Sequence, residues 1–249
     1  DLLRSAFARF LPTQRVVVPA NPRMLEGALA HTLTADKLHA ILREAETGNT
    51  RRLFALYRDV LSSDDSIQSD FSTRKLAVLG EPMAIQPFDK KTAEDVRAAD
   101  EIRWMLDDLP RPVDRWKELL DATLYPVVVM EKEYKAATRK GLRYQIAGLH
   151  HVEPQLLDFT TGKMRIEEVD PLTKAPVGSY HCPDPVRFME HRGHLLTTPD
   201  TWGGPMRSIL FWWLFSAMDR DWWVRFLERY GSPFIVGKYD QADDASRMS

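Results

Sequence analysis

The first candidates for chemistry in this chain are its seven histidines, together with its one cysteine. His150 and His151 are adjacent, and on a strand adjacent side chains point to opposite faces, so the two cannot easily share an ion. A site built from one of them with His191, His194 and Cys182 is conceivable, but the chain contains no H-E-x-x-H or C-x-x-C spacing. We therefore predict surface or core histidines, no bound metal and no cofactor.

Motifs for nucleophilic catalysis or nucleotide binding are missing from the sequence. There is no G-x-S-x-G, no G-x-x-x-x-G-K-[ST] and no G-x-G-x-x-G. Gly203-Gly204 precedes a predicted helix that starts at Pro205, and proline lacks one of the N–H groups that a phosphate site uses. Three pairs of acids have the setting of solvated faces: Glu167-Glu168, Asp107-Asp108 and Asp243-Asp244. The sequence predicts no catalytic site and a protein that is not an enzyme.

The composition is that of an ordinary globular protein. A net charge of −2 over 249 residues and a pI near 6.4 argue against nucleic-acid binding through overall charge. A single cysteine cannot form an internal disulfide, and no apolar run approaches the roughly 20 residues that span a bilayer. The chain starts at Asp1 without a methionine and stops in a polar stretch, so we expect it to be part of a longer polypeptide.

Periodicity and turn residues predict an α+β fold in which helices pack around a small mixed or antiparallel sheet. Helices are expected over 34–48, 53–61, 67–80, 92–109 and 113–123, with a short edge strand at 81–87. The clearest strand is 126–134, and 142–149 is its expected partner. An antiparallel insert follows, built from "LLDF", "MRIEEV", "RFMEH" and "HLLTT". We expect residues 1–23, with arginines at Arg4, Arg9 and Arg15 and three prolines, to form an extended arm.

A long aromatic-rich helix is predicted from Pro205 toward Tyr230. At helical spacing one stripe is expected to be core: Phe211, Phe215, Met218, Trp222 and Phe226. Other faces are also aromatic, and a helix that is apolar on several faces must be buried on more than one side. The residues that we assign to a subunit contact are Trp213, Trp223 and Tyr230, with the arm arginines as further candidates. Residues predicted to shape the ends of this element are Gly204, Pro205, Gly231, Pro233 and Gly237.

Two long stretches resemble the portal proteins of Mu-like tailed bacteriophages. They are "LFALYRDVLSSDDSIQSDFSTRKLAVLGEPMAI", with Arg74 on its helix, and "PMRSILFWWLFSAMDRDWWVRFLERYGSPFIVGKY". The second carries the glycine-proline entry, the tryptophan-bearing helix and the exit of the family pattern, which here is Phe226, Glu228, Tyr230, Gly231 and Pro233. The resemblance extends from about Met24 to Tyr239.

The resemblance implies a structural subunit of the portal wing. Members form a ring, usually twelve-fold, at one capsid vertex, and double-stranded DNA passes through it without sequence specificity during packaging and ejection. Implied partners are further copies of the chain, the terminase, the major capsid or scaffold protein and head-completion proteins, with assembly in the host cytoplasm and no membrane. Residues 24–239 would form the wing-like domain, and 240–249 would begin the stem.

Two other hypotheses stay open at this point. One is a metal-dependent enzyme of the phage head that uses His150 or His151 with His191 and His194. The other is a monomeric adaptor or minor head protein that binds the portal without forming the ring. Oligomeric state separates the ring subunit from the adaptor.

Overall fold

The structure is a computed structural model, and it describes residues 33–139, 141–170, 172–173, 175–193 and 197–231. The chain divides into two compact units, with the boundary between Leu210 and Phe211. The predicted domain boundaries after residues 23 and 239 lie outside the described residues. Within the described ranges no helix is long and apolar enough to cross a membrane.

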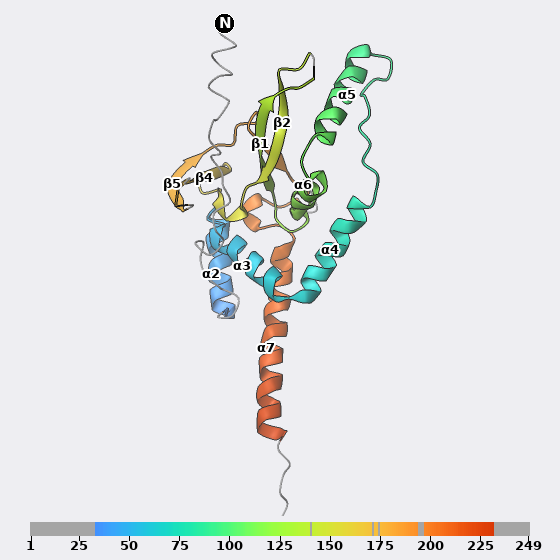
Figure 1. Cartoon of the computed structure of the whole chain (residues 1–249). Coiled ribbons are helices and arrows are strands. Elements are labelled where there is room, and N and C mark those ends of the chain that lie inside the picture. The colour runs from blue at the N-terminus through green and yellow to red at the C-terminus, as the bar shows by residue number, and fades with distance from the viewer. Residues whose placement is uncertain (1–32, 140, 171, 174, 194–196, 232–249) are drawn as a thin grey trace, which may run out of the picture. The chain divides into compact units, whose positions relative to one another are not determined.

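Six α-helices are present in the described part of the chain, and the predicted α+β class is confirmed (Figure 1). Helix starts follow the capping residues: the Thr34 hydroxyl accepts from the Lys37 N–H at 3.3 Å, and the Asp64 carboxylate accepts from the Ile67 N–H at 3.1 Å. The helices are α2 Ala35–Glu46, α3 Arg51–Ser63, α4 Asp65–Leu79, α5 Ala93–Asp107, α6 Pro112–Leu119 and α7 Met206–Tyr230. Short 3₁₀ segments are η3 Leu120–Thr123, η4 Pro154–Leu156 and η5 Asp200–Trp202.

The strands form two antiparallel three-stranded sheets. The first has the order β2-β1-β6, with β1 Val128–Ala136 and β2 Tyr144–His151 paired as the sequence predicts and β6 Phe188–His191 on the other side of β1. The second has the order β3-β4-β5, formed by β3 Leu157–Asp158, β4 Arg165–Val169 and β5 Pro176–His181. The sequence predicted one insert and did not identify β5, whose residues are mostly exposed and lack an apolar pattern.

The predicted edge strand at 81–87 is wrong, because residues 82–87 form no regular structure. Pro82 and Pro87 supply no backbone N–H, which removes two of the donors a strand would need. The Ile85 carbonyl instead accepts hydrogen bonds from Nε and Nη2 of Arg103, at 3.0 and 2.6 Å. A side chain from α5 therefore holds this connection in place. The predicted piece "HLLTT" falls largely on residues 194–196, which are not described.

The main core lies around α3, which buries residues on all sides. Leu53, Leu56 and Tyr57 are fully buried and Phe54 is 1% exposed. Phe54 and Tyr57 pack with Tyr125 in an aromatic cluster whose ring centroids are 5.4 to 5.9 Å apart. This separation is typical of favourable aromatic packing. Helix α2 adds Leu38, Ile41, Leu42 and Ala45 to the core.

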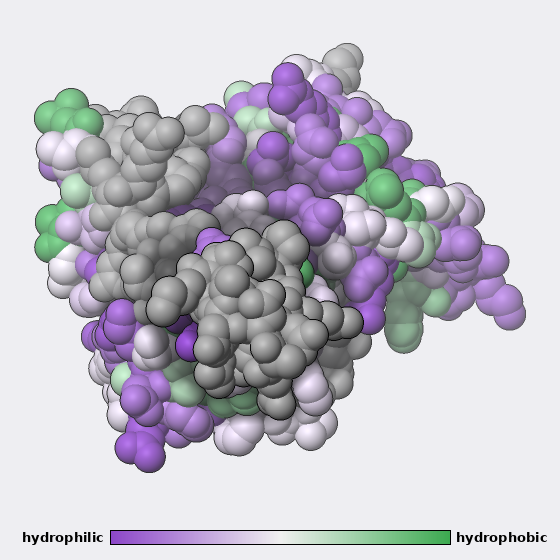
Figure 2. Space-filling view, turned by 90° about the horizontal axis from the view of Figure 1, so that it is seen from below, coloured by the Kyte–Doolittle hydropathy of each residue, from purple (hydrophilic) through white to green (hydrophobic). Residues whose placement is uncertain are grey.

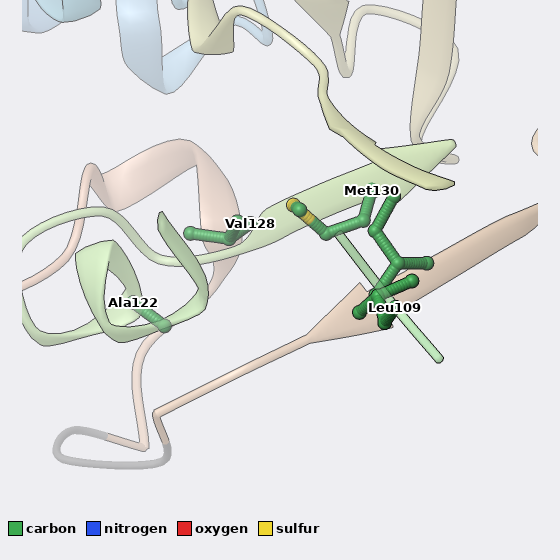
Figure 3. Close-up of a cluster of buried hydrophobic side chains, with 5 residues drawn as sticks. Leu109, Ala122, Val128 and Met130 are labelled. Atoms are coloured by element: carbon green, nitrogen blue, oxygen red, sulfur yellow. The ribbon is translucent and has the colours of Figure 1, made fainter. Parts of the chain in front are cut away.

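A second apolar cluster fixes the β1–β2 hairpin to the segments around α6 (Figure 3). Val128 and Met130 from β1 contact Leu109 and Ala122, and Leu149 on β2 completes the buried set. The four residues labelled in Figure 3 come from the α5–α6 connection, η3 and β1, and Leu109 precedes Val128 by 19 residues. Long-range packing therefore positions the hairpin.

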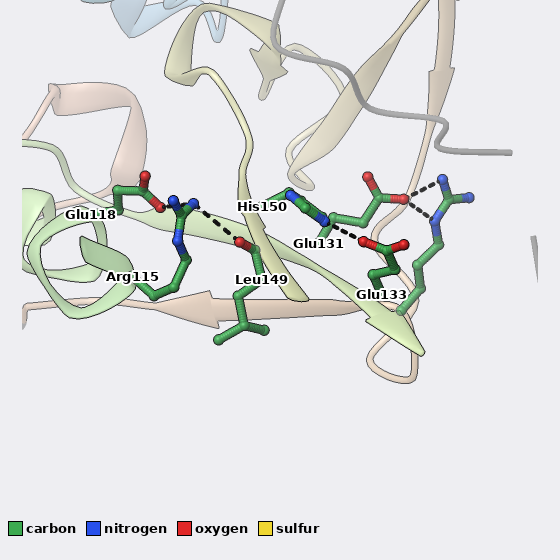
Figure 4. A network of polar contacts seen from close by, with 7 residues as sticks. Arg115, Glu118, Glu131, Glu133, Leu149 and His150 are labelled. Carbon is green, nitrogen blue, oxygen red and sulfur yellow. Dashed lines mark hydrogen bonds and ion pairs between the residues drawn. The ribbon is translucent and has the colours of Figure 1, made fainter. Parts of the chain in front are cut away.

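Polar contacts extend along the same hairpin (Figure 4). Arg115 on α6 pairs with Glu118 at 2.7 Å and donates to the Leu149 carbonyl at 3.2 Å. On β1 the buried Glu131 carboxylate accepts two hydrogen bonds from the Arg187 guanidinium, at 2.6 and 2.8 Å. Because the Glu131 carboxylate is almost fully buried, the Arg187 pair supplies the compensation that a buried charge requires.

Candidate subunit interface

Helix α7 follows a turn of two glycines that contacts the main core. Gly203 and Gly204 have φ values of +95° and +70°, which glycine adopts without strain. A Cβ on Gly203 would lie 2.5 Å from the Tyr57 hydroxyl oxygen, and one on Gly204 would lie 2.8 Å from the Leu124 carbonyl oxygen. The Tyr57 hydroxyl also donates to the Gly203 carbonyl at 2.8 Å. Conformation and close approach therefore both require glycine at this turn.

The first regular residue of α7 is Met206, directly after Pro205. The Arg207 N–H donates to the Gly204 carbonyl at 3.2 Å, so the turn and the first helical residues are connected. Such a position suits proline, because the first N–H groups of a helix have no intrahelical partner. Two of the five predicted junction residues, Gly204 and Pro205, therefore adjoin the start of the helix.

The beginning of α7 is buried on one face. Met206 and Leu210 are fully buried, Leu214 is 3% exposed and Trp213 is 8% exposed. Their separations of four, three and one residues put them on one side of the helix. Trp213, which the sequence assigned to a subunit contact, thus offers little surface to a partner. Its indole Nε1 is buried and has no hydrogen-bond partner within the described residues.

A second face of α7 carries exposed aromatic side chains, and we call it the aromatic face. It consists of Trp212 (76% exposed), Phe215 (59%), Trp222 (69%), Trp223 (62%), Phe226 (48%) and Tyr230 (49%). The predicted core stripe is therefore wrong for Phe215, Trp222 and Phe226, and also for Met218, which is 42% exposed. Trp223 and Tyr230, predicted at an interface, do present surface.

The spacing of the aromatic face is that of a helix that packs against another helix. Trp212, Phe215, Trp222 and Phe226 fit a pattern of alternating three- and four-residue steps, with Asp219 at the remaining step. The Trp223 and Phe226 rings are stacked, with centroids 5.5 Å apart and planes 9° apart. The predicted stripe shares Phe215, Trp222 and Phe226 with the aromatic face, so the sequence identified these residues as neighbours on the helix but not their exposure.

Gly231 follows the last residue of α7. Its N–H donates to the Leu227 carbonyl at 2.7 Å. A Cβ at Gly231 would clash with the Leu227 carbonyl oxygen, and its φ is not in the left-handed region that the predicted cap implies. Close approach is therefore the reason for glycine here. The remaining predicted residues, Pro233 and Gly237 at the exit and Arg4, Arg9 and Arg15 in the arm, lie outside the described residues.

The histidines do not converge on one place. His150 on β2 contacts the Glu133 carboxylate at 2.7 Å, and burial lowers the pKa of His151. His191 is on β6, which is separated from β2 by β1. Cys182 is exposed, and His194 is not among the described residues. No group of three or more His, Cys, Asp or Glu side chains suited to a metal is found in the described ranges.

A polar cavity of about 280 Å³ lies between the start of α3 and the second sheet. Arg51 pairs with Glu167 on its wall, and Arg165 pairs with Asp158 at 2.6 Å. The Arg165 guanidinium also lies 4.8 Å from the centroid of the Tyr180 ring. The Arg51–Glu167 pair joins α3 to the second sheet, whereas the Arg165–Asp158 pair joins β4 to β3 within that sheet.

Comparison with known proteins places the chain in a family. The family described as "Portal protein of Mu bacteriophage" matches residues 54–249. Among relatives, the portal protein of Escherichia phage Mu is 27% identical over 209 residues, which is 83% of this chain and 39% of that protein. The Mu-like prophage FluMu protein gp29 of Haemophilus influenzae is 26% identical over 212 residues, 85% of this chain and 40% of that protein.

The match covers well over half of the chain and includes α3 to α7 and both sheets. This α+β protein, with a long aromatic helix after its sheets, belongs to the Mu-type family of bacteriophage portal proteins. The chain spans about two fifths of the length of the relatives that it matches. The predicted family is confirmed.

Proposed function

We propose that the protein is a structural subunit of a ring at one vertex of a phage capsid. The ring is a conduit for double-stranded DNA during packaging and ejection. Membership of the portal family over residues 54–249 is the observation that carries this proposal. The role needs no active site in this chain, because positioning and passage of DNA are mechanical tasks.

The charge of the chain supports a conduit. Its 34 basic and 36 acidic residues nearly cancel. Every phosphate that a protein neutralises adds binding free energy, which DNA moving through a channel would have to overcome. A nearly neutral protein therefore suits passage better than a strongly basic one, and DNA passes through without sequence-specific contacts.

The aromatic face supports self-assembly. Its six side chains are 48 to 76% exposed, which corresponds to roughly 700 Å² of surface. The largest apolar patch of a typical monomer is about 300–600 Å², and larger patches mark interaction sites. Trp223 and Tyr230 are the proposed contact residues. Arg4, Arg9 and Arg15 in the arm are further proposed contacts.

The proposed assembly has twelve copies and several partners. The terminase docks on the ring during packaging, head-completion proteins follow, and the major capsid or scaffold protein surrounds the ring. The ring assembles in the host cytoplasm and remains at the portal vertex of the virion. The family assignment is the observation that supports these proposed partners.

Measurement of the assembly state tests the proposal. The full-length protein should form rings in negative-stain images, and native mass spectrometry should give a mass close to twelve subunits. A full-length protein that stays monomeric at high concentration would contradict the ring and favour the adaptor hypothesis. Addition of the terminase should then raise the sedimentation coefficient of the ring but not that of the monomer.

A further inference from the structure

The exposed part of α7 has another face, distinct from the aromatic face, whose side chains are mostly smaller. Ala217, Val224 and Leu227 are aliphatic, and Val224 and Leu227 are 54% and 53% exposed. The helical period places Ala217 and Val224 roughly opposite the centre of the aromatic face, and Leu227 between the two faces. We call this the small face, and it consists of Ser216, Ala217, Arg220, Val224, Leu227 and Glu228.

The two faces also differ in where they carry charge. Asp219 is part of the three- and four-residue steps of the aromatic face, and Arg229 lies at its edge. Arg220 and Glu228 lie on the small face. Each face therefore has one acid and one base, in the opposite order along the helix.

We propose that the aromatic face of α7 packs against the small face of α7 in the neighbouring copy. The inference rests on the proposed ring, because a ring closes only through two different surfaces of each subunit. Rotation about the ring axis leaves each α7 at the same height as its neighbour and pointing in the same sense. In such a pair Asp219 faces Arg220 of the next copy, and Arg229 faces Glu228.

Size and area agree with this pairing. Large aromatic side chains opposite alanine, serine and valine can fill the spaces between the smaller residues, as knobs fill holes in helix packing. The exposed surface of the aromatic face, roughly 700 Å², is close to the 800 Å² or so that each partner buries in a standard protein interface. Two aromatic faces meeting each other would leave both small faces uncovered and would give a two-fold dimer.

Cysteine cross-linking tests the contact in the full-length protein. The background is Cys182→Ser, because Cys182 is the only cysteine among the residues of this chain. The test variant adds Phe226→Cys and Val224→Cys. Residues two apart on a helix do not face each other, so the two new thiols cannot bond within one α7. A disulfide between the two new thiols must therefore join different copies.

The expected product is a ladder of disulfide-linked species that extends up to the full ring, since each copy is joined on both sides. Each single variant should give no ladder. A matched double variant, Arg225→Cys with Val224→Cys, should give far less product, because Arg225 lies on neither face. Dimers from Phe226→Cys alone would mean that two aromatic faces meet, and this would overturn the inference.

Two outcomes distinguish a wrong α7 contact from a wrong ring. Rings that form normally but give no cross-link with the test variant would overturn the α7 contact and leave the portal ring standing. A parent protein that forms no ring would overturn the proposed function itself.

Charge exchange gives a second readout. Asp219→Arg and Arg220→Asp should each lower the subunit association constant by about two- to fivefold per contact, since each places like charges opposite each other. The double variant should recover most of this loss. No recovery in the double variant, with rings and folding otherwise intact, would show that the two residues do not face each other.

Discussion

Helix α3 and the exposed part of α7 are both rich in large apolar side chains, and they use them in opposite ways. In α3 the rings of Phe54 and Tyr57 are at most 1% exposed. In α7 the rings of Trp222 and Trp223 are 69% and 62% exposed. Apolar content alone therefore does not distinguish a core helix from a helix whose aromatic side chains are exposed.

The neighbours of each helix make the difference. Tyr125, η4 and α2 pack around α3. Along α7, burial is confined to the face that carries Met206, Leu210 and Leu214. The free energy of unfolding of variants in each helix tests this difference.

The largest effect is expected from Phe54→Ala. Removal of a buried ring costs about 3–5 kcal/mol through lost transfer free energy and the cavity left behind. Urea denaturation of the variant and the parent should show this difference. Phe215→Ala, which truncates a ring that is 59% exposed, is the control and should cost far less. Equal costs would mean that α7 is as much a core helix as α3.

A smaller loss is expected from Gly203→Ala, which tests the turn between the core and α7. The added Cβ would meet the Tyr57 hydroxyl, and the backbone has a positive φ, so we expect a cost of about 1–3 kcal/mol. Gly162→Ala is the control, because Gly162 also has a positive φ but no atom lies within 4 Å of its Cβ position. Identical thermal shifts for the two variants would show that strain, and not the Tyr57 contact, decides the cost.

Acid should lower the free energy of unfolding through His151 in the core, and this effect should not extend to association through the aromatic face. Burial lowers the pKa of His151 in the folded state below its ordinary 6.5. The unfolded chain therefore binds the proton first, so the stability from neutral His151 is complete above pH 6.5 and is lost as the pH falls through 6.5 toward the folded pKa. Asp121, Lys75 and Arg115 also act on this imidazole.

The variant His151→Gln isolates this effect. Burial raises the pKa of Glu118 and Glu153, so both act in the opposite direction, and they are common to parent and variant. The parent should lose more unfolding free energy than the variant between about pH 7 and about pH 5. No histidine occurs in residues 206–230, so ring association should show no such difference. Parallel pH profiles would contradict the assignment to His151.

The smallest effect on stability is expected from Trp223→Ala. This side chain is 62% exposed, so the free energy of unfolding of a subunit should change by no more than about 0.5 kcal/mol. The fraction of subunits in rings should nevertheless fall, which sedimentation velocity can measure. Arg225→Ala is the control for a change on the same helix. If the variant lost subunit stability as strongly as it lost ring formation, Trp223 would be a core residue and not a contact residue.

Local signals in the sequence were sufficient for most elements. The helices that begin near Thr34 and Asp64 and the β1–β2 pairing were predicted because they depend on neighbouring residues and on alternation. The second sheet was not predicted as a separate sheet, because β5 has little apolar pattern and is defined by its pairing with β4. The glycine turn was visible as a break, but its contact with Tyr57 was not.

For the candidate interface the sequence determined the residue types, the helix and the family. The large aromatic residues and the smaller residues that form the two faces of α7 can already be read in the stretch from Phe211 to Tyr230. Only the tertiary structure decided that Trp213 is buried while Trp222 and Phe226 are exposed. Helical periodicity shows which residues share a face, whereas burial depends on which faces other segments cover, and those segments are distant in sequence.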